Sequence, residues 1–189
     1  VRSGCISAKL PILSYLQKAD RSNKPILGIC NGCQILLEAG FVTNSLQTYS
    51  LDVAVTYNTT SEIQTGFICD WVYVRPENAD KNLFLRLYED SDVLPIPVNH
   101  GEGKFIYHHD LNEFAKLVYC TSSGEILDSF PTNPNGSLGN LAGLSNDSGN
   151  VFAMMPHPER ASFTKQLPSW LNLESLKKAP WEKMFISLK

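Results

Sequence analysis

The chain has 189 residues, of which 43% are hydrophobic and 19% charged, and its formal net charge is −3 at pH 7. The slight acidity argues against a nucleic-acid-binding surface, and no apolar run approaches the roughly 20 residues of a membrane-spanning helix. The five cysteines are odd in number and irregularly spaced, which favours reduced thiols in a cytoplasmic protein over a disulfide framework. With no internal repeat or linker, the sequence predicts a single domain over residues 1–189.

The N-terminal part predicts a helix, a buried strand and a second helix. Apolar residues recur at helical spacing within residues 4–19, with a kink or a restart of the helix at Pro11. Residues 26–29 form a compact apolar run, as expected of a strand covered on both faces. From Asn31 the apolar period becomes helical, and it ends at Gly40, which accepts the positive φ of a helix C-terminus.

The middle of the chain predicts mainly strands joined by polar turns. Pro76 is expected to stop one strand, and Pro95 and Pro97 confine the next to an edge or an irregular position. The segment 110–115 is expected to be a short helix with its aspartate as the N-cap, whereas 82–88 fits either a strand or a helix. Runs of β-forming residues predict strands at 51–57, 67–74, 93–98, 105–107, 117–120, 141–144 and 151–155.

Cys30 lies at the junction between the buried strand and the second helix, with Gly28 and Gly32 two residues away on either side. This is the layout of a nucleophile elbow, in which small neighbours allow a tight turn that exposes the side chain. The positive end of the helix lowers a thiol pKa and can hold an oxyanion. For an isolated cysteine, a buried thiol of the core is the commoner alternative.

His157 and Glu159 follow the last predicted strand and are separated by Pro158. In extended backbone, residues i and i+2 point to the same side, so Glu159 can orient the imidazole while its other nitrogen faces a sulfur. Cys30 and this pair both follow buried strands, where open α/β sheets bind ligands. The pattern predicts a catalytic triad, against the alternatives of a structural histidine and a surface pair between Glu159 and Arg160.

Three other groups of residues could carry chemistry. Cys30 and Cys33 form a C-x-x-C that fits a redox pair or half of a zinc site, but the second half is absent. His100 and Glu102 lie in a glycine-interrupted segment that is either part of a polar pocket or an ordinary turn. The histidines at 108–109 would diverge in a strand, so solvated side chains are expected there and no metal site is predicted.

Four motifs support a family resemblance. They are G-I-C-N-G-C-Q at 28–34, P-V-N-H-G-E-G at 97–103, N-P-N-G-S at 133–137 followed by L-A-G-L at 141–144, and M-M-P-H-P-E-R at 154–160. Together they resemble the triad-type glutamine amidotransferases, and more closely the glutaminase subunits or domains of phosphoribosylformylglycinamidine synthases. The first and last motifs are shared across the family in general form. The cysteine followed by Asn-Gly, the H-G-E-G loop and the N-P-N-G-S loop are typical of the purine branch.

The resemblance implies an α/β fold with three αβα layers around an open, mostly parallel, doubly wound sheet of the flavodoxin-like type. It implies Cys30 as the nucleophile, His157 as the base and acid, and Glu159 as the group that orients the histidine. Glutamine would be hydrolysed to glutamate and ammonia through a γ-glutamyl thioester.

The resemblance also implies substrate-binding residues and a partner. The backbone N–H of Asn31 would be one oxyanion donor, and Gln34 and His100 would lie near the glutamine pocket. A larger synthetase, as a separate subunit or a fused domain, would use the ammonia with ATP and magnesium to convert formylglycinamide ribonucleotide to formylglycinamidine ribonucleotide. No cofactor is expected in this chain, and neither nucleic acid nor membrane is expected as a partner. Residues 161–189 would form a C-terminal extension of the same domain.

Members of this family begin with a strand and a glycine-rich loop that supplies the second oxyanion donor, whereas this chain begins at Val1. We therefore expect an N-terminally truncated domain and a weak glutaminase, since removing one such donor costs about 10²–10³ in rate. The alternatives are another triad amidotransferase (for GMP, CTP or anthranilate), a related Cys-His hydrolase, or a non-catalytic interaction domain. The H-G-E-G and N-P-N-G-S loops argue against the first two alternatives.

Overall fold

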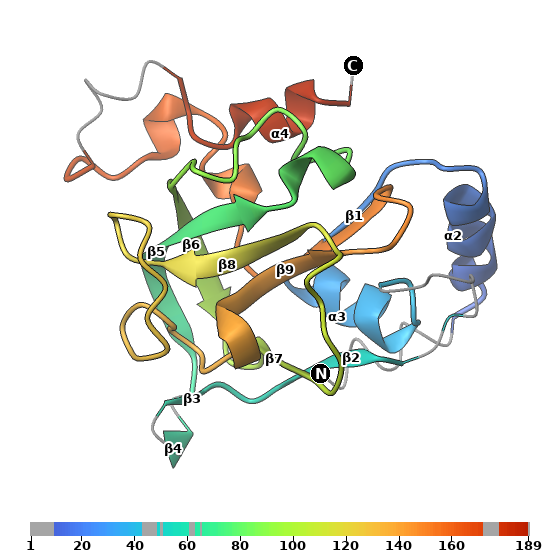
Figure 1. Cartoon of the computed structure of the whole chain (residues 1–189), viewed down its shortest axis with the longest axis horizontal. Helices are drawn as coiled ribbons and strands as arrows, with labels where there is room; N and C mark the ends of the chain where they lie inside the picture. Colours follow the sequence, from blue (N-terminus) through green and yellow to red (C-terminus); the bar gives the residue numbers. More distant parts are fainter. Residues whose placement is uncertain are drawn as a thin grey trace.

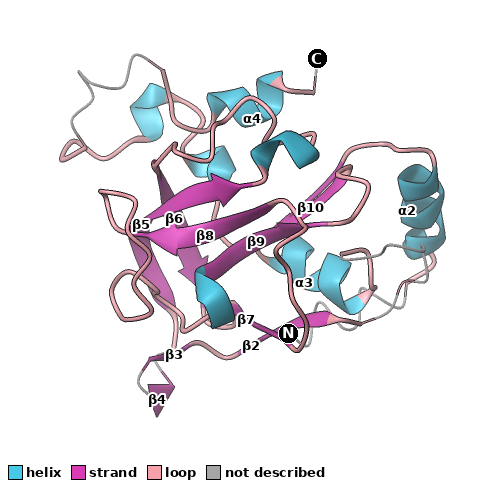
Figure 2. Ribbon diagram, in the orientation of Figure 1, coloured by secondary structure: helices cyan, strands magenta, loops and turns pink. Residues whose placement is uncertain are grey.

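The computed structural model describes residues 10–42, 49, 51–60, 63–64, 66–171 and 178–188. Its centre is a six-stranded sheet with the strand order β1-β10-β9-β8-β5-β6 (Figures 1 and 2). The α-helices are α2 (Ile12–Arg21), α3 (Asn31–Glu38) and α4 (Glu182–Ile186). The strands of the main sheet are β1 (Ile26–Ile29), β5 (Ile68–Glu77), β6 (Leu94–His100), β8 (Lys116–Cys120), β9 (Leu141–Ser145) and β10 (Val151–Met154). Two separate pairs are formed by β2 (Val53–Thr56) with β7 (Lys104–Tyr107) and by β3 (Thr59–Thr60) with β4 (Ile63–Gln64).

The predicted helix–strand–helix at the N-terminal end is confirmed within the described residues. Helix α2 begins directly after Pro11, whose fixed φ suits a first turn where its missing N–H is not needed. The part of the predicted helix at residues 4–9 lies outside the described residues. Helix α3 ends as expected, with Gly40 at a φ of 70°.

The fold contains helices and strands in the α/β arrangement, and its main sheet has both parallel and antiparallel strand pairs. Strands β1 and β10 are parallel, whereas the pairs β10–β9, β9–β8, β8–β5 and β5–β6 are antiparallel. The expectation of a mostly parallel sheet is therefore wrong. Parallel neighbours need a crossover, usually a helix, and among the described residues α3 is the one α-helix between β1 and β10.

Prolines are tolerated in this sheet where a strand edge lacks a partner. Pro95 and Pro97 lie in β6, which is an edge strand as predicted. Pro76 was expected to stop β5, but the strand continues to Glu77. Strand β6 pairs with β5 only as far as Val74, so the missing N–H of Pro76 lies beyond that ladder.

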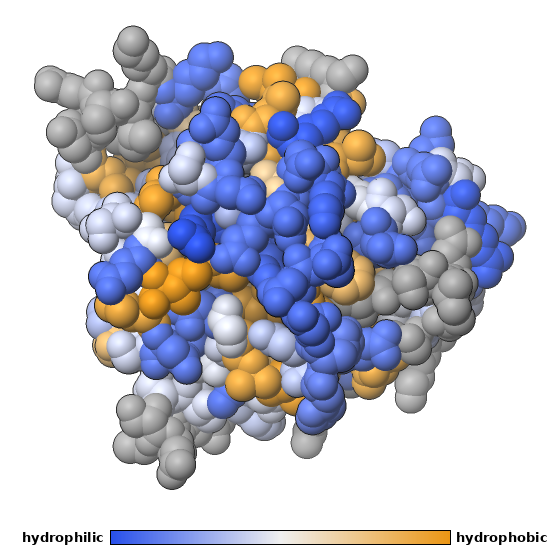
Figure 3. All heavy atoms as spheres, in the orientation of Figure 1, coloured by the Kyte–Doolittle hydropathy of each residue, from blue (hydrophilic) through white to orange (hydrophobic). Residues whose placement is uncertain are grey.

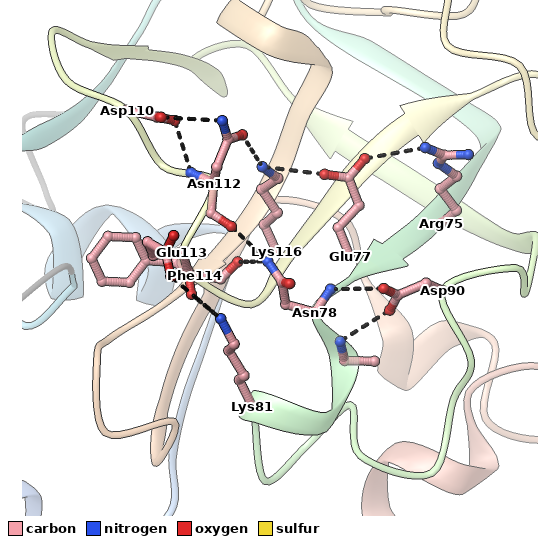
Figure 4. A network of polar contacts seen from close by, with 11 residues as sticks. Arg75, Glu77, Asn78, Lys81, Asp90, Asp110, Asn112, Glu113, Phe114 and Lys116 are labelled. Carbon is pink, nitrogen blue, oxygen red and sulfur yellow. Dashed lines mark hydrogen bonds and ion pairs between the residues drawn. The ribbon is translucent and has the colours of Figure 1, made fainter.

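The predicted short helix at 110–115 is absent, and the segment is a loop held by side chains (Figure 4). Asp110 accepts a hydrogen bond from the backbone N–H of Asn112 at 2.9 Å, which closes a turn without starting a helix. The Asn78 amide donates to the carbonyls of Asn112 and Phe114. Residues 82–88, left open between strand and helix, form turns.

Alternate residues of β10 enter two apolar cores on opposite faces of the sheet. Val151 and Ala153 pack in a core with α3 and the β2–β7 pair. Phe152 and Met154 pack in the other core, which the C-terminal segment covers with Trp181. A covered layer on each face of the sheet agrees with the predicted three-layer α/β architecture (Figure 1).

The surface shows no continuous apolar area on the face drawn in Figure 3, where hydrophilic side chains separate several smaller apolar patches. Within the described residues, every helix is too short or too polar to cross a bilayer.

The carboxyl ends of β1 and β10, which are parallel neighbours, lie side by side because Ile29 is paired with Met154. The residues that follow these two strands are the ones singled out from the sequence.

Candidate active site

The turn between β1 and α3 places Cys30 in a backbone conformation with φ 52° and ψ −107°, which non-glycine residues adopt rarely. The turn is tight enough that a Cβ on Gly28 would lie 2.6 Å from the Gly32 carbonyl oxygen. A Cβ on Gly32 would meet nothing within 4 Å. The predicted nucleophile elbow is therefore present, and Gly28 is the glycine that its close packing requires.

One backbone contact and one side-chain contact connect Cys30 to the ends of two other strands. Its N–H donates to the Met154 carbonyl of β10 at 2.8 Å, and its Sγ lies 3.8 Å from the Asn99 carbonyl of β6. The thiol is half-buried, whereas Cys33, one turn into α3, is fully buried in the core. Burial, and next the charge of Cys30, raise the pKa of Cys33 well above its ordinary value. A neutral, enclosed Cys33 argues against the redox alternative for the C-x-x-C.

His157 is held beside this elbow by the backbone that follows β10. Its N–H donates to the Pro97 carbonyl of β6 at 2.9 Å, and a 3-10 turn, Pro158–Arg160, follows it. The histidine Nδ1 lies 2.7 Å from Oε1 of Glu159. The predicted pairing of these two side chains is confirmed, but the 3-10 turn, and not extended backbone, brings them together.

The electrostatics of the pair favour a protonated imidazole. The pKa of His157 is raised to about 9, first by its interaction with Cys30 and then by its hydrogen bond with Glu159. Burial acts to raise the pKa of Glu159, but the hydrogen bond from His157 and further interactions lower it overall. Arg160, with its Nε 3.6 Å from the Glu159 carboxylate, contributes to that lowering. Glu159 therefore stays ionised beside an imidazolium.

The other ring nitrogen of His157, Nε2, is buried and has no hydrogen-bond partner among the described residues. With Nδ1 committed to Glu159, Nε2 is the nitrogen left for proton exchange with a sulfur or a substrate. A thiol, an imidazole and an orienting carboxylate can together perform nucleophilic attack on an amide carbonyl and protonate the leaving nitrogen.

His100 belongs to the same site, although its ring makes no hydrogen bond to the described residues. It is 4% exposed, and both ring nitrogens are buried without a partner. Burial, and next the charge of His157, lower the pKa of His100 to about 4. A neutral imidazole with two unused nitrogens lies close enough to His157 to feel its charge. The polar-pocket interpretation is therefore favoured over an ordinary turn.

The remaining residues considered in the sequence are Asn31 and Gln34 of α3 and the two histidines at 108–109. Asn31 begins α3 directly after Cys30, so its backbone N–H lies at the positive end of the helix. Gln34 is 7% exposed and donates its side-chain amide to the Glu102 carbonyl at 2.9 Å, so it holds the loop that carries His100. The side chains of 108–109 are exposed, as expected.

Two functional candidates escaped the sequence reasoning. Asn58 and Asn135 are both fully buried and hydrogen-bond the backbone of the loop after β6. Asn135 lies in the recognised N-P-N-G-S motif, which was a usable signal. Asn58 lies in a polar segment that reads as a turn, and nothing local distinguishes it.

Comparisons with known proteins agree with this geometry. The family profile described as a CobB/CobQ-like glutamine amidotransferase domain matches residues 11–189. Phosphoribosylformylglycinamidine synthase subunit PurQ of Methanocaldococcus jannaschii is 41% identical over 168 residues, covering 86% of this chain and 66% of that protein. The corresponding subunit of Methanothrix thermoacetophila is 37% identical over 178 residues, covering 89% of this chain and 68% of that protein.

A solved structure is similar as well. A chain in the structure of PurLQS from Thermotoga maritima aligns with a TM-score of 0.71 at 31% identity, covering 98% of this chain and 70% of that chain. The chain thus spans about two thirds of the length of the relatives it matches. The resemblance inferred from the four motifs is confirmed. The chain belongs to the family of CobB/CobQ-like glutamine amidotransferases.

Proposed function

We propose that this chain is the glutaminase component of a phosphoribosylformylglycinamidine synthase. The observation that carries the proposal is the strained Cys30 at the end of β1 beside the 2.7 Å pair of His157 and Glu159 at the end of β10. The relatives named as subunits of that synthase support the choice of reaction. The described cysteines are free thiols, which supports a cytoplasmic location.

The first half-reaction is the attack of the Cys30 thiolate on the side-chain carbonyl carbon of glutamine. The raised pKa of His157 favours a thiolate–imidazolium pair before the attack. The tetrahedral oxyanion accepts a hydrogen bond from the backbone N–H of Asn31 at the start of α3. His157 then gives its proton to the leaving nitrogen, which departs as ammonia and leaves a γ-glutamyl thioester.

The second half-reaction releases glutamate. His157, now neutral, takes a proton from water, and the hydroxide attacks the thioester carbonyl; collapse of this intermediate returns the thiolate to Cys30. Glu159 keeps the imidazole in the required orientation through both steps. A synthetase partner that binds ATP and magnesium would use the ammonia to convert formylglycinamide ribonucleotide to its amidine.

Two further residues contribute to binding in this proposal. The neutral ring of His100 offers two unused nitrogens to the glutamine molecule beside His157. Gln34 acts on the substrate through the loop that it holds, because its amide is engaged by the Glu102 carbonyl.

Alkylation by a glutamine-like electrophile, read by mass spectrometry, tests the proposal together with glutamate release. We expect labelling at Cys30, loss of labelling and of glutamate release in Cys30→Ser, and retention of labelling in the control Cys33→Ala. Glutamine should protect Cys30 from the electrophile. Equal labelling of Cys30 and Cys33, or glutamate release by Cys30→Ser, would contradict the assigned nucleophile.

A further inference from the structure

The loop 100–103, between β6 and β7, has its backbone held from three distant parts of the chain. Asn58 donates its side-chain amide to the His100 carbonyl at 2.8 Å and accepts from the Gly103 N–H at 2.9 Å. Its own backbone N–H donates to the Gly101 carbonyl at 3.0 Å. On the other side of the loop, Gln34 of α3 donates to the Glu102 carbonyl. A loop with so many of its polar groups satisfied by buried side chains has one defined conformation.

Asn135 completes this arrangement from the N-P-N-G-S segment. Its side-chain amide donates to the Gly103 carbonyl at 2.8 Å, while its side-chain oxygen accepts from the N–H and the hydroxyl of Ser137. The Ser137 hydroxyl also accepts from the N–H of Phe105, the second residue of β7. Asn135 is fully buried, so its amide has no water to replace these partners.

The His100 ring packs directly against Gly103. A Cβ on Gly103 would lie 2.3 Å from Cε1 and 2.4 Å from Nδ1 of that ring, so only glycine permits the contact. The residue that Asn135 and Asn58 hold is therefore the residue that fixes the imidazole. The ring itself forms no hydrogen bond to the described residues that could keep it in place.

We propose that Asn135 is a positioning residue of the active site, which acts by holding Gly103 and thereby seating the His100 ring beside His157. The two loop motifs typical of the purine branch then form one structural unit, because Asn135 of the N-P-N-G-S segment bonds Gly103 of the H-G-E-G segment. The proposal rests on the proposed glutaminase function for its kinetic consequences but not for its structural ones.

Loss of the contact between Asn135 and Gly103 should change the pKa of His100. The ring is kept neutral chiefly by burial, and the titratable group that acts on it from a neighbouring element is His157. If the loop moves and water reaches the ring, the burial effect weakens and the pKa of His100 rises from about 4 toward its ordinary value. Residues that merely stabilise the fold do not produce this change.

The test compares Asn135→Asp with Asn133→Asp, and Asn135→Ala with Asn133→Ala. Asn133 is a matched control because it is 2% exposed and its side chain bonds described residues outside the 100–103 loop. It donates to Asp128, Ser137 and Asn140, and it accepts from the N–H groups of Gly136 and Ser137. The readout is the NMR titration of the four histidines, with His100 assigned from its loss in His100→Gln. Glutamine kinetics are measured on the same proteins.

We expect the pKa of His100 to rise toward its ordinary value of about 6.5 in the Asn135 variants and to stay near 4 in the wild type and the Asn133 variants. We also expect kcat/KM for glutamine to fall by about 10- to 100-fold more in the Asn135 variants, as displacement of a site group does. Unchanged titration of His100 in both Asn135 variants would overturn the proposal. A wild type that titrates as expected but hydrolyses no glutamine would instead count against the proposed function.

Discussion

Nδ1 of His157 lies 2.7 Å from Oε1 of Glu159, and this contact is one of the causes that raise the pKa of the histidine to about 9. Replacing the carboxylate in Glu159→Gln removes its charge and the fixed orientation of the ring. We expect kcat for glutamine hydrolysis to fall by about 10²–10⁴, by analogy with triads that lose their acidic member. The pKa of His157, read from the pH dependence of Cys30 alkylation, should fall as well.

Arg160→Gln is the control for that experiment. The Arg160 side chain contacts the same carboxylate at 3.6 Å and is half-exposed. The hydrogen bond from Arg160 to His157 comes from its backbone N–H, which the substitution keeps. An exposed pair of this kind contributes little, so kcat should stay within about threefold of the wild type. If Glu159→Gln behaved like Arg160→Gln in kcat and in the alkylation profile, Glu159 would not be the orienting group.

The elbow glycines give a second prediction, because their surroundings differ. Gly28→Ala would bring a methyl group 2.5 Å from Leu36 and 2.6 Å from the Gly32 carbonyl, which forces β1 and α3 apart. We expect a loss of about 1–3 kcal/mol in the free energy of unfolding, as in other overpacked sites. Urea unfolding measures it.

Gly32→Ala is the matched control, since its added methyl group meets nothing within 4 Å. Alanine also favours the helix, so the unfolding free energy should be unchanged or higher by up to about 1 kcal/mol. Equal destabilisation by both substitutions would show that the close packing at Gly28 does not limit the turn.

Local patterns in the sequence were sufficient for the elbow and for the partners of the thiol. The change from a strand period to a helix period located Cys30, and the two-residue spacing of His157 and Glu159 predicted their contact. The prolines of β6 correctly predicted an edge strand. Each of these features depends on residues within a few positions of one another.

The features that were missed depend on contacts between distant segments. Strand directions are set by which strands pair, so the mixed sheet could not be read from strand composition. Pro76 remains in β5 because β6 ends its pairing at Val74, which is a property of the partner strand. Asn58 bonds a carbonyl 42 positions away, and nothing in its own segment predicts that contact.

The lowered pKa of His100 predicts a specific dependence of stability on pH. In the unfolded chain this histidine binds a proton below its ordinary pKa of about 6.5, whereas in the folded protein it does so only near 4. As pH falls from about 6.5 to 4, protons therefore favour the unfolded state. The limiting slope for one proton is about 1.4 kcal/mol per pH unit.

Urea unfolding of the wild type and His100→Gln at pH 7, 6 and 5 checks this prediction. The variant should lose less stability on acidification, because its side chain at position 100 does not titrate. His157 acts in the opposite direction and is present in both proteins: its pKa is raised to about 9, so its stabilising effect is fully present below pH 6.5 and is lost as pH rises above it. Parallel pH profiles for the two proteins would contradict the assignment to His100.

The loop after β7 offers a prediction about stability away from the active site (Figure 4). Asn78 has a left-handed φ of 53°, and its side-chain amide donates to the carbonyls of Asn112 at 2.7 Å and Phe114 at 3.0 Å. Asn78→Ala removes both hydrogen bonds and places alanine in a conformation it disfavours. We expect a loss of about 1–3 kcal/mol in the free energy of unfolding, with kcat unchanged.

Asn23→Ala separates the two causes of that loss. Asn23 has nearly the same φ, 52°, is exposed, and its side chain makes no hydrogen bond to the described residues, so its replacement measures the conformational part alone. The difference between the two variants in urea unfolding then gives the contribution of the Asn78 amide, which should be at least about 0.5 kcal/mol. Equal losses would mean that the amide does not hold the 110–116 loop, and that the ion pair between Lys116 and Glu77 at 3.2 Å is sufficient to keep it in place.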